Sequence, residues 1–435
     1  MDWWLILVLI LGLLLILFAT GLPVAFAFLA LNILGLFFLV GGEKALLLLA
    51  TSAYTSIASF VLIAVPLFIL MGEILFHSGV VSVILEAVDH WIGRLRARLC
   101  LVAVGAGTIL SAMTGSTLGD VALLGATLLP EMDQRGYDKK LSTGSILASS
   151  TIAAIIPPSG LAVLLGSLGG ISIAGLLIGG IIPGLLLALS YTAYIIGITW
   201  IRPQLAPIHI GPHISLLDKL RDLLRIAPFG IIIFLVLGTI LLGIASPSEA
   251  AAMGAFGCFI VAAFHKRLNF AVVKKSLSAT MDVFGMVFII LVGSIAFSQV
   301  LSITGATRAL TELVAALPLP LIVMFIIMQL AVFIMGMFID SLSIMMITLP
   351  IFMPVTEALH IDPIWFGIVY LINIVCGGKT PPFALMLFVI KGVAPDTSMG
   401  QIYRGVVPFI LTDIMGMALI MAFPAIALWL PRLVL

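Results

Sequence analysis

Apolar segments of about 20 residues, the length that crosses the roughly 30 Å hydrocarbon core of a bilayer as a helix, recur along nearly the whole of this 435-residue chain. Hydrophobic residues make up 63% of the chain and charged residues 9%, whereas soluble domains average about 45–50% and about 25%. A soluble α/β fold could not bury so much apolar surface. We therefore predict an all-α polytopic membrane protein.

Two of the apolar segments are interrupted at mid-length by small polar residues and a carboxylate, and each is followed by a double proline. The first interruption is TGSTLGD at 114–120, followed by IPPS at 156–159. The second is GMFIDS at 336–341, followed by TPP at 380–382. Such breaks free backbone polar groups, which membranes tolerate only where protein or a cavity covers them. Broken helices at matching places in two halves are typical of secondary transporters, with a site near the membrane midplane.

The pattern predicts about ten transmembrane helices plus two re-entrant helical hairpins. The hairpins lie at about 99–130 and 317–354 and carry the interrupted motifs at their centres. The spans are predicted near Trp3–Ala19, Leu22–Val40, Phe60–Phe76, Gly144–Leu168, Ile171–Trp200, Ile226–Ile244, Ala250–Phe264, Asp282–Leu301, Ile364–Ile390 and Val406–Leu430.

This arrangement gives the basic residues a strong bias towards one side of the membrane. Of the 20 lysines and arginines, only Lys44, Arg308 and Arg432 fall on the other side, and Lys379 falls inside the membrane. The positive-inside rule makes the crowded side cytoplasmic. Both termini are then periplasmic, and the two hairpins enter from opposite sides. The N-terminal apolar segment lacks a basic n-region and a small-residue cleavage site, so we expect a retained helix.

The order of the predicted elements repeats, with opposite orientation in the membrane. Each repeat reads span, short amphipathic arm, hairpin, proline-broken span and final span. The first repeat covers residues 60–200, with its broken helix at about 144–168. The second covers 282–435, with its broken helix at about 364–390. Residues 1–59 and 201–281 are predicted to form scaffold helices, the latter with a cytoplasmic loop. Inverted repeats of this kind are typical of alternating-access transporters.

The interrupted motifs offer oxygen ligands to a hard cation such as sodium. The predicted sodium-binding residues are Thr114, Gly115, Ser116, Asp120, Pro157, Gly336, Asp340 and Thr380, and the predicted substrate-binding residues are Pro158, Ser159, Lys379 and Pro381. A carboxylate at this depth costs at least about 2.5–3.5 kcal/mol on insertion scales, which favours a functional role for Asp120 and Asp340. The alternative is an aspartate that only caps a helix. For Glu73, Glu249, Asp282 and Asp413, nearer to span ends, structural pairing or snorkelling is favoured.

Lys379 directly precedes the second double proline, and four roles are open to it. It could neutralise a substrate anion, pair with Asp340, fill one cation position with its own ammonium, or form an ion pair without a transport role.

Catalysis finds little support in the sequence. The six histidines lie at predicted span ends or in loops, without an H-E-x-x-H or G-x-S-x-G motif, and no Walker A lysine is present. Cys100, Cys258 and Cys376 are far apart, so neither a disulfide framework nor a transition-metal site is expected. No organic cofactor and no nucleic-acid partner are expected. We predict that the chain is not an enzyme.

At these motifs the chain resembles the large membrane subunit of tripartite ATP-independent periplasmic (TRAP) transporters, within the ion transporter superfamily. The matching stretches are SAMTGSTLGDVALLGATLLPEM, IAAIIPPSG, GMFIDSLSIMMITLPIFMPV and TPPFALMLFV. By position, Thr114, Ser116 and Asp120 match the family's first hairpin motif, and Gly336 and Asp340 match the second. Lys379 departs from the small or apolar residue expected there, so an unmodified second sodium site is not implied.

The resemblance implies a bacterial inner-membrane permease that imports small organic acid anions, carboxylates or sulfonates, by a sodium-driven elevator mechanism. It also implies two partners, a small four-helix membrane subunit and a periplasmic substrate-binding protein. An ion-coupled carboxylate transporter of the same superfamily that works without a binding protein is the alternative. An intramembrane enzyme would need a base–nucleophile pair at one depth, and the sequence offers none. A channel is a further alternative to a transporter, because residues alone do not reveal whether access alternates between the two sides of the membrane.

Overall fold

The computed structural model describes residues 2–57, 60–93, 95–114, 117–207 and 215–434, and this part of the chain is helical without strands. Seven of its helices are long and apolar enough to cross a membrane, or up to nine if each bent helix pair counts as one span. The all-α membrane fold is therefore confirmed, whereas the count of ten spans stays a prediction.

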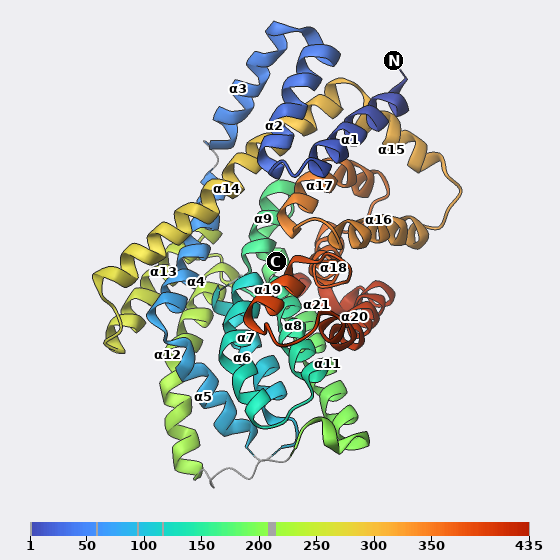
Figure 1. Ribbon diagram of the computed structural model, residues 1–435. Coiled ribbons are helices and arrows are strands. Elements are labelled where there is room, and N and C mark those ends of the chain that lie inside the picture. The colour runs from blue at the N-terminus through green and yellow to red at the C-terminus, as the bar shows by residue number, and fades with distance from the viewer. Residues whose placement is uncertain (1, 58–59, 94, 115–116, 208–214, 435) are drawn as a thin grey trace.

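Long helices on one side of the molecule form a wall that reaches from α12 to the N-terminal helices (Figure 1). The helices of this wall and of the N-terminal cluster are α1 (Trp3–Ala19), α2 (Val24–Gly35), α3 (Glu43–Ile57), α4 (Ala64–Ser78), α12 (Leu216–Leu241), α13 (Pro247–Phe264) and α14 (Phe270–Ile303). The 34-residue α14 contacts α4 near one end and α2 and α3 near the other. Asn32 of α2 donates from Nδ2 to the Gly293 carbonyl of α14 at 2.6 Å, so a buried polar contact fixes this crossing.

Helix α3 is not one of the predicted spans, and its sequence includes the hydroxyl residues Thr51 and Ser52. The structure shows where one of these hydroxyls goes. Ser52 Oγ lies 2.5 Å from Gln299 Oε1 of α14. A polar residue within this helix is thus satisfied by its neighbour instead of by water.

Each predicted hairpin is a pair of helices separated at the interrupted motif. The first consists of α6 (Arg98–Thr114) and α7 (Thr117–Gln134), and the second of α16 (Leu321–Gly336) and α17 (Ser341–Ala358). The members of each pair contact each other. The break between α16 and α17 agrees with the expectation that the second segment is not a continuous helix, and residues 115–116 between α6 and α7 lie outside the described residues.

The two proline motifs each divide a helix. The first break separates α8 (Lys139–Ile155) from α9 (Gly160–Gly169), whose axes differ by 44°. The second separates α18 (Pro363–Gly377) from α19 (Leu385–Val393). Both breaks contain a cis X–Pro bond. Proline lacks the N–H that would continue the helical ladder, which explains why neither helix continues through its double proline.

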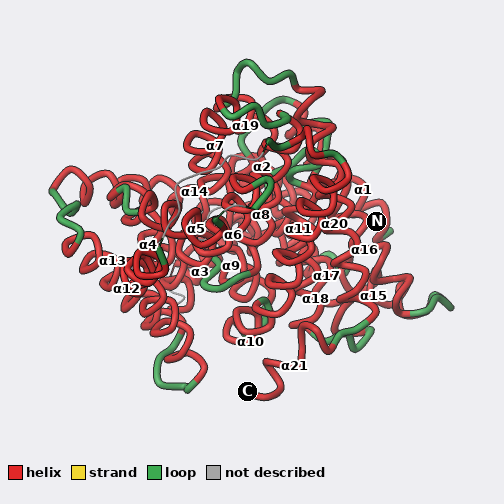
Figure 2. Tube along the Cα trace, turned by 90° about the horizontal axis from the view of Figure 1, so that it is seen from below, coloured by secondary structure: helices red, strands yellow, loops and turns green. Residues whose placement is uncertain are grey.

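The remaining helices complete the two predicted repeats. The amphipathic arms are α5 (Val81–Ile92) and α15 (Ala306–Ala316), and the terminal segments are α10 (Ile173–Gly179), α11 (Ile181–Ile201), α20 (Met399–Ala422) and α21 (Ala425–Val434). Contacts between the halves are matched. Helix α7 packs on α19, α17 packs on α9, and α8 packs on α18 (Figures 1 and 2). This reciprocal packing supports the predicted two-repeat organisation, whose residue boundaries stay a prediction.

Candidate functional site

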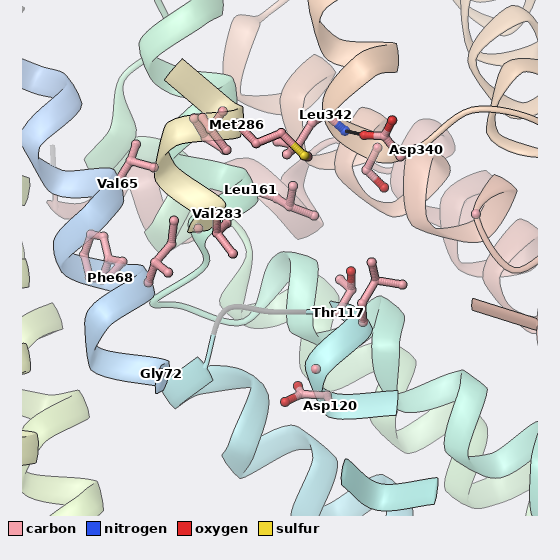
Figure 3. A pocket seen from close by; sticks show the side chains of 18 of the residues that line it. Val65, Phe68, Gly72, Thr117, Asp120, Leu161, Val283, Met286, Asp340 and Leu342 are labelled. Atoms are coloured by element: carbon pink, nitrogen blue, oxygen red, sulfur yellow. Dashed lines mark hydrogen bonds between the residues drawn. The ribbon is translucent and has the colours of Figure 1, made fainter. Parts of the chain in front are cut away.

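A cavity of about 560 Å³ lies between the helical wall and the broken motifs (Figure 3). On the wall side it is lined by α4 and α14, with Val65, Phe68 and Gly72 on the former and Val283 and Met286 on the latter. Its volume falls in the range of about 300–1,000 Å³ that is typical of small-molecule sites. The cavity is therefore the candidate binding site.

Four helices begin at the opposite side of this cavity. The lining includes the first residues of α7 (Thr117 to Asp120), α9 (Gly160 and Leu161), α17 (Ser341 and Leu342) and α19 (Leu385 and Met386). Two of these helices follow hairpin breaks and two follow proline breaks, one of each from either half. Helix N-termini carry unpaired N–H groups and the positive end of the macrodipole. The cavity is therefore favourable to negative charge on this side.

Asp120 and Asp340, the two carboxylates singled out in the sequence, both line this cavity (Figure 3). Asp120 lies in the first turn of α7 and is buried. Asp340 is the N-cap of α17, where Oδ1 accepts from the N–H groups of Leu342 at 3.0 Å and Ser343 at 3.1 Å. Ser343 Oγ also donates to Oδ2. The capping alternative thus describes Asp340 in this structure, and its position in the cavity leaves a second role open.

The other residues of the first hairpin motif are only partly described. Thr114 is the last residue of α6. Gly115 and Ser116 lie outside the described residues, and their role in sodium binding stays a prediction.

The residues of the first proline break are buried and do not line the cavity. Pro157 and Pro158 are buried. Ser159 Oγ donates to the Ala154 carbonyl at 2.7 Å and accepts from Ala162 N–H at 3.2 Å. Its hydroxyl thereby satisfies one backbone group on each side of the break, and the neighbouring Gly160 is the residue that reaches the cavity.

The corresponding second-half residues also have structural partners. A Cβ on Gly336 would lie 2.7 Å from Gly377 Cα, so this glycine permits the close crossing of α16 and α18. Thr380 Oγ1 donates to the Cys376 carbonyl at 2.7 Å. Pro381 is partly buried, and the carbonyl of the next residue, Pro382, accepts from Tyr403 OH at 2.8 Å. Their predicted contacts with sodium or substrate stay predictions.

Lys379 pairs with Asp413 and not with Asp340. Its Nζ lies 2.8 Å from Asp413 Oδ2, and both side chains are fully buried. Thr151 Oγ1 accepts a hydrogen bond from Nζ, and Tyr191 OH donates to Asp413 Oδ1. Its neighbour Gly378 lines the cavity, whereas Lys379 itself does not. This geometry favours an action of Lys379 through Asp413 over direct contact with a substrate.

Two acidic residues gain importance from the structure. Asp413 was expected to pair structurally or to snorkel near a span end, and it pairs with Lys379, which lies in the break between α18 and α19. Glu73, also assigned to structural pairing, lines the cavity from α4 and lies 3.3 Å from His77 Nε2. The Glu-x-x-x-His spacing signals this local pair, but nothing in the sequence indicates that it faces the hairpin tips.

The charged side chains of the cavity are all acidic. Among its described lining residues are Glu73, Asp120 and Asp340 and no lysine or arginine. No group of three or more His, Cys, Asp or Glu side chains within the described residues is placed to hold a metal ion.

The sequence matches the family model of the tripartite ATP-independent periplasmic transporter DctM component over residues 11–426. The chain belongs to this family. It is therefore a multi-pass membrane protein and the large membrane subunit of a TRAP transporter, which confirms the resemblance seen in the motifs.

Similar proteins agree with this membership. The C4-dicarboxylate TRAP transporter large permease protein DctM of Rhodobacter capsulatus is 31% identical over 98% of each chain. The ectoine TRAP transporter large permease protein TeaC of Halomonas elongata is 30% identical over 96% of each chain. The crystal structure of the Alcanivorax borkumensis YdaH transporter aligns with a TM-score of 0.64 over 90% of each chain at 16% identity, a likeness of fold alone.

Proposed function

We propose that the chain is the permease subunit of a sodium-coupled importer of a small organic acid anion. The observation that carries the proposal is the composition of the cavity. Four helix N-termini face it, yet its charged side chains are Glu73, Asp120 and Asp340. An anion entering this space meets favourable backbone dipoles and unfavourable carboxylates. Bound cations would offset that repulsion, which couples anion binding to cation binding.

The positions of Asp120 and Asp340 support sodium as the coupling ion. Asp120 lies in the first turn of α7, and Asp340 is the N-cap of α17, so each carboxylate is at the start of the second helix of its hairpin. Sodium is a hard cation that suits such oxygen ligands. The matched positions of the two residues in the two halves support one cation site per hairpin.

The substrate class follows from the relatives and from the helix termini. The Rhodobacter capsulatus relative is named for C4-dicarboxylates and the Halomonas elongata relative for ectoine. Both names denote small molecules that carry a carboxylate. The N–H groups at the start of α19 are placed to receive such a group, because α19 has no side-chain cap.

The family also supports two partners. A tripartite periplasmic transporter requires a periplasmic binding protein and a further membrane subunit besides this chain. We propose that the binding protein delivers the anion from the periplasm, that the small membrane subunit covers part of the exposed apolar surface of the scaffold, and that the complex resides in the bacterial inner membrane.

An elevator movement fits the division of the cavity lining. The α4 and α14 residues form one wall, and the hairpins with the broken helices form the other. If the second group moves as a body against the first, the site crosses the membrane with its ligands. Cross-links between the two walls test this movement, as described below.

Proteoliposomes that hold this chain with the small membrane subunit provide the decisive test. With the binding protein and a candidate acid outside, we expect uptake driven by an inward sodium gradient. A potassium gradient of equal size should not drive it. Uptake that is indifferent to sodium would refute the coupling, and full uptake without the binding protein would favour the alternative carboxylate transporter.

A further inference from the structure

Lys379 is a fully buried cationic side chain next to Gly378, which lines the cavity. The Lys379 ammonium is 2.8 Å from Asp413 Oδ2, with both side chains fully buried. Lys379 directly precedes the second proline break, and Asp413 lies in α20. This ion pair therefore connects the second broken helix to the last long helix of the same half.

Oxygen atoms from the other half complete the surroundings of this ammonium. Thr151 of α8 accepts a hydrogen bond from Nζ and lies 3.4 Å from Asp413 Oδ2. Tyr191 of α11 donates its hydroxyl proton to Asp413 Oδ1, and Nζ lies 5.5 Å from the centre of the Tyr191 ring. A carboxylate, a hydroxyl and an aromatic face are ligands that a monovalent cation also accepts.

The place of this cluster links it to both breaks. Thr151 is in the last turns of α8, just before the first proline break, and Lys379 is just before the second. A buried ion pair contributes little net stability compared with apolar residues of the same volume, because desolvation offsets the attraction. A contribution to stability is thus a weak explanation for the buried charge of Lys379 between the two broken helices.

We propose that the Lys379 ammonium is a tethered monovalent cation. It fills a cage formed by Asp413, Thr151 and Tyr191 that would bind a free cation in its absence. The chain then needs one free coupling ion fewer per cycle than it would with an empty cage. This inference rests on the proposed sodium coupling, since it concerns the number of ions that take part.

Two substitutions that remove the same charge separate this proposal from a purely structural ion pair. Lys379→Ala removes the ammonium and leaves space for an ion. Lys379→Met removes the ammonium but fills the space with a side chain of similar length. The purified variants are heated in sodium chloride and in choline chloride of equal ionic strength, and their unfolding midpoints are compared with those of the wild type.

A tethered cation predicts a gain of sodium response in Lys379→Ala alone. Ligand binding to the folded state raises the midpoint with ligand concentration, and we expect sodium to add about 2 °C or more beyond its effect on the wild type. Lys379→Met should show no such addition. The double variant Lys379→Ala with Asp413→Asn should lose it, because the cage then lacks its carboxylate. In proteoliposomes, Lys379→Ala should also show a steeper dependence of uptake on sodium concentration.

Equal sodium responses of Lys379→Ala and the wild type would overturn the proposal. Failure to recover folded Lys379→Ala in sodium, potassium or ammonium chloride would overturn it too, since a cage that accepts a free cation should be refilled by one of them. The wild-type response to sodium separately reports the proposed coupling. If it is present while the gain in Lys379→Ala is absent, only the tethered cation is wrong.

Discussion

At the scale of single residues, Asp340 has two separable properties, its charge and its capping geometry. The cap orders the start of α17 through the N–H groups of Leu342 and Ser343, whereas the charge faces the cavity. Asparagine can supply the first property without the second, since it is as good an N-cap as aspartate. Alanine supplies neither.

We therefore expect Asp340→Asn to retain the wild-type unfolding midpoint and to reduce the rate of sodium-dependent uptake at least about tenfold. Such a reduction corresponds to about 1.4 kcal/mol in the free energy of sodium binding or of the transport barrier. Asp340→Ala should lose uptake and also about 0.5–2 kcal/mol of stability. Asp138→Asn is the matched control, because Asp138 caps α8 with the same geometry and lies outside the cavity lining. If Asp340→Asn kept the sodium dependence of the wild type, the role of Asp340 would be limited to capping α17.

Asp120 provides the corresponding test in the first hairpin. We expect Asp120→Ala to reach the membrane and to lose sodium-dependent uptake, because it removes a cavity carboxylate from the matched position. Membrane expression and uptake measured on the same cells separate loss of function from loss of protein. A variant with unchanged sodium dependence would contradict one cation site per hairpin.

At the scale of elements, glycine decides how closely the second hairpin approaches the second broken helix. Gly336 and Gly377 bring α16 and α18 together so that a Cβ on either would lie less than 3 Å from the backbone of the other. Asn373 of α18 also donates to the carbonyl of Gln329 in α16 at 2.6 Å. The hairpin tip is therefore held against the break by backbone packing and a buried hydrogen bond.

Gly336→Ala should lower the free energy of unfolding by about 1–3 kcal/mol, the usual cost of overpacking. The loss should be the same with and without sodium, because it arises from the contact with Gly377. Gly197→Ala in α11 is the control, since its new Cβ would meet nothing within 4 Å. Thermal unfolding in detergent measures the stability of both variants. If Gly336→Ala lost stability only in sodium-containing buffer, the result would instead support the predicted role of Gly336 in cation binding.

At the scale of the whole molecule, the cavity divides the chain into two walls that the elevator proposal requires to move relative to each other. Met286 of α14 and Leu342 of α17 belong to different walls and lie beside each other in Figure 3, whereas Val65 and Met286 belong to the same wall. The native cysteines Cys100, Cys258 and Cys376 are buried, which favours selective labelling of introduced ones.

A bifunctional thiol reagent applied to a cysteine pair at Met286 and Leu342 should therefore abolish uptake, and a cleavable linker should restore it on reduction. The same reagent on a pair at Val65 and Met286 should leave uptake nearly unchanged. Uptake that survives a confirmed link between the opposite walls would rule out their relative movement.

The predicted orientation is a second property of the whole molecule. The bias of basic residues places the C-terminus in the periplasm and the loop after α11 in the cytoplasm. A phosphatase fused after the C-terminus should be active, and one fused after Pro207 inactive. The reverse pattern of activity would show that the predicted orientation in the membrane is wrong.

The sequence by itself determined the membrane class, both proline breaks, the helix pairs of the two hairpins and two of the three cavity carboxylates, Asp120 and Asp340, because these depend on local chemistry. Apolar length, proline without an N–H and glycine beside aspartate act within a few residues of the chain. Only the tertiary structure decided that Lys379 meets Asp413, that Glu73 faces the hairpin tips and that Ser159 and Gly336 serve the packing of the breaks. The Thr151 hydroxyl beside the Lys379–Asp413 pair comes from the other half of the chain, 262 residues from Asp413 in sequence. Contacts between separate helices depend on how those helices pack in three dimensions, and no pattern within one segment of sequence specifies them.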